Sequence, residues 1–283
     1  MKRVISYSLF GYGQEKHPDC FTFHSYLRGL MISLRMNRLI YPDFETWVYV
    51  DRGTYEGFKA LFDSLTDSNI CKVFIREPAQ LCEAMLWRMI PAFNPDVEVV
   101  LCRDLDSPVT MRERKCVEYW LGSTKCAHAI TDSVSHNIPM LGGMIGFRGK
   151  NLRERLGVET FEAMLSKWSG MDFSRKGSDQ DFINRHIYPL LSQYGSDSIT
   201  QHYLLGMPNT YLSDYRNTVP DITVPIPDEM RESNDVCGHI GAAGWYETAL
   251  HKFLHKYYNK FDHIRRCEAT YPDAFYWLNE NIF

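Results

Sequence analysis

The chain has 283 residues, 45% of them hydrophobic and 23% charged, which is the balance of a globular protein with one large domain or two small ones. Its 31 basic and 35 acidic residues give a formal net charge of −4, which argues against a protein that coats nucleic acid. No stretch approaches the roughly 20 apolar residues of a membrane span, and no CxxC pair occurs among the eight cysteines. We therefore expect a soluble, cytoplasmic protein with reduced thiols and no zinc site.

The first 107 residues alternate short apolar runs with segments of helical periodicity. The predicted strands are residues 4–9, 45–50, 71–75 and 97–102, and the predicted helices are residues 21–34, 55–65 and 80–90. Strands and helices that alternate at these lengths favour an α/β fold with a mostly parallel central sheet and helices on both faces.

The pattern changes after residue 107. Helices are expected over residues 111–120, 152–168 and 180–191, a Gly-rich strand-like segment over 140–148, a loop over 210–231 and a basic, aromatic helix over 245–265. We interpret residues 1–283 as one domain. Its nucleotide-binding half would be residues 1–107, its donor-sugar and acceptor half 108–245, and its C-terminal helical extension 246–283.

Two aspartates, Asp104 and Asp106, follow the apolar run of residues 97–102 with one residue between them. Ligands of open α/β sheets bind at the carboxyl ends of strands. Hard divalent cations such as Mn²⁺ or Mg²⁺ prefer carboxylate ligands and can also hold phosphate oxygens. The pair therefore indicates a metal-assisted phosphate site, although a polar turn after a strand would show the same residues.

The placement of this Asp-x-Asp motif resembles that of the GT-A (Rossmann-like) glycosyltransferases. Two later segments are similar to motifs of the glycogenin-type retaining family, glycosyltransferase family 8. Residues 178–184, Ser-Asp-Gln-Asp-Phe-Ile-Asn, resemble its Asp-Gln-Asp-x-x-Asn segment, and residues 239–241, His-Ile-Gly, resemble its His-x-Gly. The family's Lys-Pro-Trp after His-x-Gly is replaced here by Ala-Ala-Gly-Trp at residues 242–245. The resemblance therefore covers motifs and their order over roughly residues 1–245.

This resemblance implies roles for individual residues. Asp104, Asp106 and His239 would bind the metal, and Gly241 would let the backbone approach the diphosphate. Asp179 would hold donor-sugar hydroxyls and Gln180 would lie near the anomeric carbon. Taken alone, Asp179 is equally typical of a helix N-terminus, and His239 of a loop histidine bonded to backbone.

The remaining candidates for donor binding are spread over the chain. The first strand and its loop would contact the nucleoside, and Asp51 would contact the base or ribose. Arg88 and Arg103 would bind the diphosphate, unless they form ordinary salt bridges. The Gly-rich segment would line the sugar pocket. These residues are Tyr7, Ser8, Phe10, Asp51, Arg88, Arg103, Leu105, Gly142 and Gly143, with Thr131, Asp132 and His136 as further pocket residues.

The expected reaction is metal-dependent transfer of a sugar from a nucleoside-diphosphate sugar, preferably a UDP-sugar, to a hydroxyl of a glycan or glycoconjugate, with retention of configuration. An inverting enzyme would need a general base, for which Asp132, Asp179 and Asp181 are candidates. A sugar-nucleotidyltransferase, an aspartyl phosphatase and a non-catalytic carbohydrate- or partner-binding module are the alternatives. Peripheral membrane contact through the C-terminal helix is a further expectation, and no nucleic-acid partner is expected.

Overall fold

A computed structural model describes residues 1–13, 23–132, 138–194, 198–203 and 223–225. Its described strands form one sheet in the order β3-β2-β1-β4-β6-β5-β7-β8. Strand β6 runs antiparallel to both of its neighbours, β4 and β5, and the other pairings are parallel. The strands are β1 (Lys2–Leu9), β2 (Glu45–Asp51), β3 (Lys72–Arg76), β4 (Val97–Arg103), β5 (Ala127–Thr131), β6 (Met144–Arg148), β7 (Ile199–Tyr203) and β8 (Thr223–Pro225).

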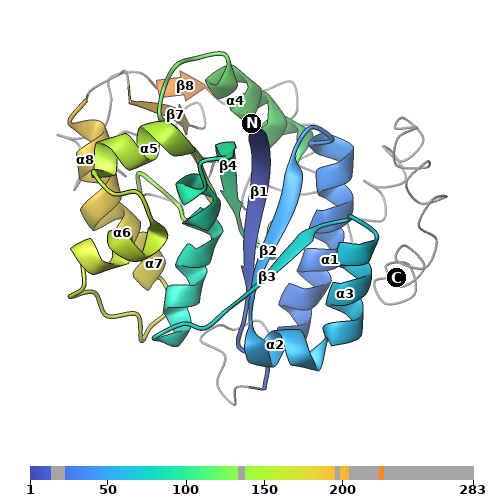
Figure 1. The fold of residues 1–283 in the computed structure, drawn as a ribbon. Coiled ribbons are helices and arrows are strands. Elements are labelled where there is room, and N and C mark those ends of the chain that lie inside the picture. Colours follow the sequence, from blue (N-terminus) through green and yellow to red (C-terminus); the bar gives the residue numbers. More distant parts are fainter. Residues whose placement is uncertain (14–22, 133–137, 195–197, 204–222, 226–283) are drawn as a thin grey trace.

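Helices cover both faces of this sheet (Figure 1). One hydrophobic cluster packs α1 (Phe23–Ile40), α3 (Lys59–Asp67) and α4 (Met111–Leu121) against one face. The other packs η1, a 3₁₀ helix at Leu81–Phe93, together with α5 (Gly149–Leu156), α6 (Phe161–Lys167), α7 (Ser178–Phe182), η2, a π-helical segment at Ile183–Ile187, and α8 (Tyr188–Ser192). A short helix, α2 (Arg52–Gly57), follows β2. The expected α/β class and mostly parallel sheet are confirmed.

The four strands predicted in the first half are present within two residues of their predicted ends. Two predicted helices are divided instead. Residues 55–65 fall in α2 and α3, which meet at Phe58, and residues 152–168 fall in α5 and α6, because Gly157 takes a left-handed φ of 64° that ends α5. Strands β5 and β7 were not predicted, since their inward residues include small, histidine and threonine side chains instead of an apolar alternation.

Strand direction places the ends of the strands at two opposite edges. The carboxyl ends of β1 to β5 and of β7 share one edge with the amino end of β6, which reverses direction between β4 and β5. Both Asp104, after β4, and the Gly-rich segment before β6 therefore come to the same edge. This geometry follows from the antiparallel insertion and is not visible in the sequence.

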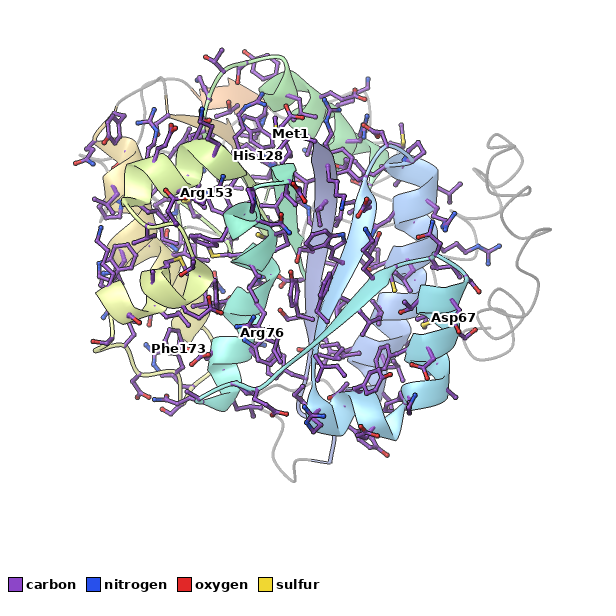
Figure 2. The ribbon with its side chains drawn as sticks, in the orientation of Figure 1. Met1, Asp67, Arg76, His128, Arg153 and Phe173 are labelled. Atoms are coloured by element: carbon purple, nitrogen blue, oxygen red, sulfur yellow. The ribbon has the colours of Figure 1, made fainter. Side chains whose placement is uncertain are left out.

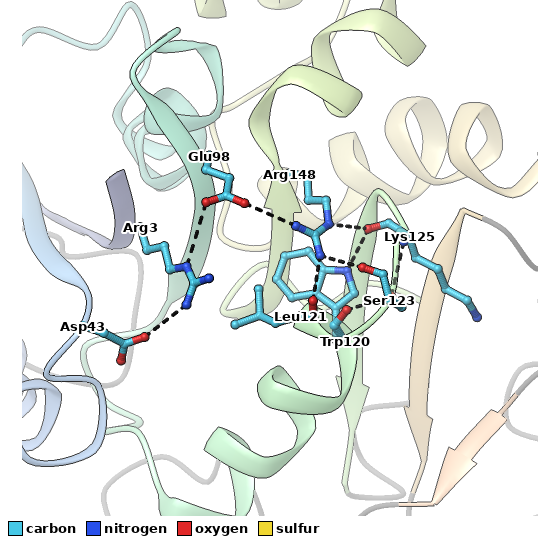
Figure 3. Close-up of polar contacts among 8 residues, drawn as sticks. All are labelled: Arg3, Asp43, Glu98, Trp120, Leu121, Ser123, Lys125 and Arg148. Atoms are coloured by element: carbon cyan, nitrogen blue, oxygen red, sulfur yellow. Dashed lines mark hydrogen bonds and ion pairs between the residues drawn. The ribbon is translucent and has the colours of Figure 1, made fainter. Parts of the chain in front are cut away.

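Arginine contacts fix the opposite edge (Figure 3). Arg148, at the end of β6, donates to the carbonyls of Leu121 and Ser123 at 3.1 and 2.7 Å, and so caps the C-terminus of α4. Glu98 lies 3.7 Å from Arg148 and 4.0 Å from Arg3. These partly exposed ion pairs each contribute little to stability. The hydrogen bonds from Arg148 to the two carbonyls fix the end of α4 relative to β6. No described helix is long and apolar enough to cross a membrane.

Candidate active site

Alternation along β4 decides which side chains reach the site. Cys102 belongs to the core cluster that faces η1, whereas Leu101 belongs to the cluster on the face of α1. Arg103 and Asp104 continue this alternation, so that Asp104 points towards η1 and Arg103 points away from it. Arg88 lies on η1, which covers this face of the sheet, and its side chain contacts Asp104.

Arg88 joins two carboxylates from distant parts of the chain. Its Nη1 donates to Oδ1 of Asp104 and its Nη2 donates to Oδ2 of Asp179, the second residue of α7. The side chains of Arg88 and Asp179 are 6% and 0% exposed, whereas that of Asp104 is 43% exposed. Asp104 is therefore the member of this triad that a ligand from solvent reaches directly.

The electrostatics of the triad are those of one cation shared by two anions. Burial by itself would lower the pKa of Arg88, but the attraction of Asp104 and then of Asp179 outweighs it and raises that pKa. Burial raises the pKa of Asp179, and Arg88 opposes this shift without cancelling it. The triad with both acids ionised carries a net negative charge, which suits a further cation.

Two glycines let the Gly-rich segment pack closely against the triad. A Cβ at Gly143 would overlap the carboxylate of Asp104, and one at Gly142 would overlap the Arg88 guanidinium and lie 2.7 Å from Oδ2 of Asp179. Any other residue would push the charged groups apart. The Gly-rich segment is thus required by close packing against the triad.

Asn184 fastens the Gly-rich segment to α7 and the residues that follow it. Its Oδ1 accepts from the Met140 amide at 3.0 Å, and its Nδ2 donates to the carbonyls of Met140 and Gln180, each at 2.8 Å. Gln201 on β7 adds a bond from Nε2 to the Pro139 carbonyl at 2.8 Å. The role of Gln201 was missed, because a lone glutamine in a sequence gives no signal of its partner.

Two oxygens at the start of α7 have no protein donor. Oδ1 of Asp179 and Oε1 of Gln180 are buried and lack a hydrogen-bond partner among the described residues. Unpaired buried acceptors cost free energy and are rare in folded proteins. A ligand hydroxyl would satisfy either oxygen if it displaced the groups that now cover both.

Several candidate residues lie away from this cluster. Tyr7 is buried on the α1 face and donates to Asn37 at 3.0 Å, and Leu105 packs in the same core. Arg103 is fully buried and donates to Glu113 at 2.8 Å and to two backbone carbonyls. Tyr7, Arg103 and Leu105 therefore lie on the opposite face of the sheet from the triad.

The other candidate carboxylates differ in their partners. Both oxygens of Asp132 bind Arg112 on α4, and both residues are buried. Asp181 pairs with Arg175. Asp51 accepts hydrogen bonds from Gly11 and Thr54 and forms the N-cap of α2. Asp106 is partly exposed on the loop after β4.

A glycine inside α1 marks a contact that sequence reasoning missed. A Cβ at Gly29 would overlap the backbone carbonyl of Leu105, so α1 presses directly on the turn between Asp104 and Asp106. An isolated glycine in a helical pattern is the signal that could have shown this close approach.

Ser8 and Phe10 lie at the end of β1. Ser8 is partly exposed and its Oγ has no hydrogen-bond partner among the described residues, while the Phe10 ring lies 6.4 Å from that of Trp87 on η1. Thr131 is buried on β5. His239, Gly241, His136 and the C-terminal helix lie outside the described residues. Within the described part of the chain, no group of three or more His, Cys, Asp or Glu side chains could hold a metal ion.

No protein-family model and no curated protein matches the chain. The fold is similar to that of mouse xyloside xylosyltransferase 1 in its apo form, at 11% identity and a TM-score of 0.41, over 81% of this chain and 98% of that one. It is also similar to a mannosyltransferase from Pyrobaculum calidifontis in complex with GDP-Man and Mn²⁺, at 11% identity and a TM-score of 0.40, over 98% and 69% of the two chains.

A third similar structure is a putative glucose-1-phosphate thymidylyltransferase from Bacillus anthracis, at 12% identity and a TM-score of 0.42, over 79% of this chain and 96% of that one. At these values the likeness extends to the α/β fold and carries no argument about function. Nothing in these comparisons points to the glycogenin-type family in particular.

Proposed function

We propose that this protein is a metal-dependent glycosyltransferase that moves a sugar from a nucleoside-diphosphate sugar, preferably a UDP-sugar, to a hydroxyl acceptor. The observation that carries the proposal is the triad of Arg88, Asp104 and Asp179 at the carboxyl edge of the sheet, bordered by two glycines. It combines a half-exposed carboxylate with buried acceptors that have no donor among the described residues, and we infer that a diphosphate-linked sugar uses both.

Two of the three proposed ligands of a divalent cation lie on the turn after β4. Asp104 is half-exposed and uses Oδ1 for Arg88, and Asp106 follows on the same turn. Carboxylates of this kind suit Mn²⁺ or Mg²⁺, and His239 would be a third ligand from outside the described residues. When bound, the metal would neutralise charge on the departing diphosphate.

The donor sugar would lie between α7 and the Gly-rich segment. Its hydroxyls would donate to the unpaired Oδ1 of Asp179 and Oε1 of Gln180. Arg88 holds the Asp179 carboxylate in place, so this acceptor is oriented before the sugar binds. Ser8 and Phe10, at the end of β1, would border the nucleoside.

The ion pairs favour retention of configuration over inversion. An inverting enzyme needs a carboxylate that can take a proton from the acceptor, and the carboxylates at Asp132, Asp179 and Asp181 each contact an arginine. Gln180 cannot act as a base, but its carbonyl can stabilise positive charge that develops on the sugar. We therefore propose a front-side reaction with Gln180 close to the anomeric carbon.

Calorimetry with UDP in the presence and absence of Mn²⁺ tests the proposal. Asp104→Ala and Asp106→Ala should each lower Mn²⁺-dependent affinity for UDP by well over tenfold, or more than about 1.4 kcal/mol. Asp67→Ala, an exposed aspartate at the end of α3 (Figure 2), is the control and should bind as the wild type does. Unchanged affinity in both site variants would refute the metal site.

Product analysis separates the proposed reaction from its alternatives. A glycosyltransferase releases nucleoside diphosphate from a sugar donor, whereas a nucleotidyltransferase consumes nucleoside triphosphate and a sugar phosphate. A binding module releases neither product. A panel of UDP-, GDP- and TDP-sugars with and without added pyrophosphate, followed by chromatography of the nucleotides, distinguishes the three, because a nucleotidyltransferase forms nucleoside triphosphate only when pyrophosphate is present.

A further inference from the structure

We propose that Asp51 and Thr54 act together as a clamp that positions the loop after β1 for nucleotide binding, and that Asp51 does not read the base. This inference rests on the proposed function, since it concerns the nucleotide end of the same site. The clamp is defined as Asp51, Thr54 and the loop backbone at Gly11 and Tyr12.

The hydrogen bonds of the clamp tie two neighbouring strand ends together. Oδ2 of Asp51 accepts from the Gly11 amide and from the Thr54 hydroxyl, the latter at 3.2 Å. Oδ1 of Asp51 accepts from the Thr54 amide at 2.7 Å. The Thr54 hydroxyl oxygen in turn accepts from the Tyr12 amide at 3.2 Å. Two consecutive amides of the β1 loop are thus held by two side chains from the β2 end.

Ring contacts hold the same loop from its other side. The Tyr12 ring lies 4.8 Å from the Phe58 ring and 5.2 Å from the Phe23 ring, measured between centroids. A Cβ at Gly57 would overlap the Tyr12 ring, so the ring packs directly against the backbone of α2 at this glycine. Two residues earlier, Phe10 packs towards Trp87 on the opposite face of the sheet. The loop therefore crosses the end of β1 and is fixed on both faces.

The bonding of Asp51 leaves it poorly placed to recognise a base. Its carboxylate accepts three hydrogen bonds from its own chain, and the residue is only 9% exposed. A base reader would have to exchange these bonds for bonds to the ligand, at the cost of unpaired buried donors. A clamp keeps its hydrogen bonds when nucleotide binds, because the groups bonded to Asp51 and Thr54 belong to the protein and stay in place. The expected consequence is that Asp51 affects all nucleotides alike.

The test is a double-mutant cycle with Asp51→Asn and Thr54→Val, read by calorimetry for UDP and GDP with Mn²⁺. Each single variant should weaken binding of both nucleotides by a similar factor of about tenfold, about 1.4 kcal/mol. The double variant should lose less than the product of the two factors, since both act on one loop. Thr66→Val, an exposed threonine on α3, is the matched control and should leave both affinities unchanged.

Hydrogen exchange of the unliganded protein tests the clamp independently of nucleotide. The Gly11 and Tyr12 amides should exchange faster in both variants than in the wild type, while amides in the middle of β1 should not. If Asp51→Asn changes the ratio of UDP to GDP affinity and Thr54→Val changes neither affinity, Asp51 reads the base and the clamp is refuted. If the wild type binds no nucleotide, the proposed function fails. In that case, faster exchange of the Gly11 and Tyr12 amides in the variants would show that Asp51 and Thr54 hold the loop without a role in nucleotide binding.

Discussion

At the scale of single residues, Asp179 combines full burial with a charge that pairs with Arg88. Its pKa in the folded protein is raised by burial, so its contribution to stability is present below the unfolded pKa and is lost as the pH rises through the folded pKa. Ionisation of Asp179 therefore lowers the stability of the unliganded fold. Under the proposed function, this cost keeps a carboxylate in place to accept from sugar hydroxyls.

We predict that Asp179→Asn reduces turnover much more than affinity for UDP, because the amide cannot hold the sugar as the carboxylate does. The unliganded variant should be at least as stable as the wild type at pH 7, since Asn mimics the protonated acid. Thermal unfolding at pH 7 and at pH 4 measures this, and the difference should shrink at the lower pH. A variant that unfolds well below the wild type at pH 7 would contradict the assignment.

Gly143 offers a second test at the residue scale. Gly143→Ala should displace the Asp104 carboxylate, which a new Cβ would overlap, and so lower Mn²⁺-dependent UDP affinity by about tenfold or more. The matched control is Gly170→Ala, because no atom lies within 4 Å of the Cβ that it would add. Calorimetry on both variants is the measurement. Equal affinities in the two would show that Asp104 is not held against the Gly-rich segment.

At the scale of elements, β5 and β7 place two histidines beneath α4. The rings of His128 and His202 lie 5.9 Å apart, and His128 stacks on Trp120 at 4.7 Å. Burial lowers the pKa of His128 well below its usual value and that of His202 to about 4. Both histidines are therefore neutral at pH 7 and act as packing residues.

The sign of the pH dependence follows from these lowered pKa values. Stability from a neutral buried histidine is complete above the unfolded pKa of about 6.5 and is lost as the pH falls towards the folded pKa. For His202 the loss should be on the order of 3 kcal/mol. We predict that His202→Leu flattens the dependence of the unfolding midpoint on pH between about 6.5 and 4. The exposed His24→Leu is the control, and equal slopes in both variants would contradict the prediction.

At the scale of the whole molecule, the two faces of the sheet differ in the charged groups that they hold. Both faces hold an apolar core. The α1 face also holds the Arg103–Glu113 pair, whereas the triad lies on the η1 face at the carboxyl ends of the strands. The contacts of Asp132 with Arg112 and of Asp179 with Arg88 remove candidate bases from this edge. We predict that the product keeps the anomeric configuration of the donor. NMR of the first-formed glycoside measures it, and an inverted product would require one of these ion pairs to open during the reaction.

The sequence by itself determined the elements that depend on local pattern. Apolar runs located the four strands of the first half, and Asp104 follows the last of them. The motif at residues 178–184 made Asp179 a candidate site residue but gave no indication of its partner Arg88. The strand predictions succeeded because an apolar run is a property of consecutive residues.

Only the tertiary structure decided which of these residues meet. The antiparallel insertion of β6 brings Gly143 to Asp104, and η1 supplies Arg88 to an aspartate 91 positions away in sequence. Alternation along a strand sends Arg103 and Tyr7 into the core while their neighbours Asp104 and Ser8 face the other way. No local signal carries that choice, because the face on which a ligand binds is set by which helices cover the sheet.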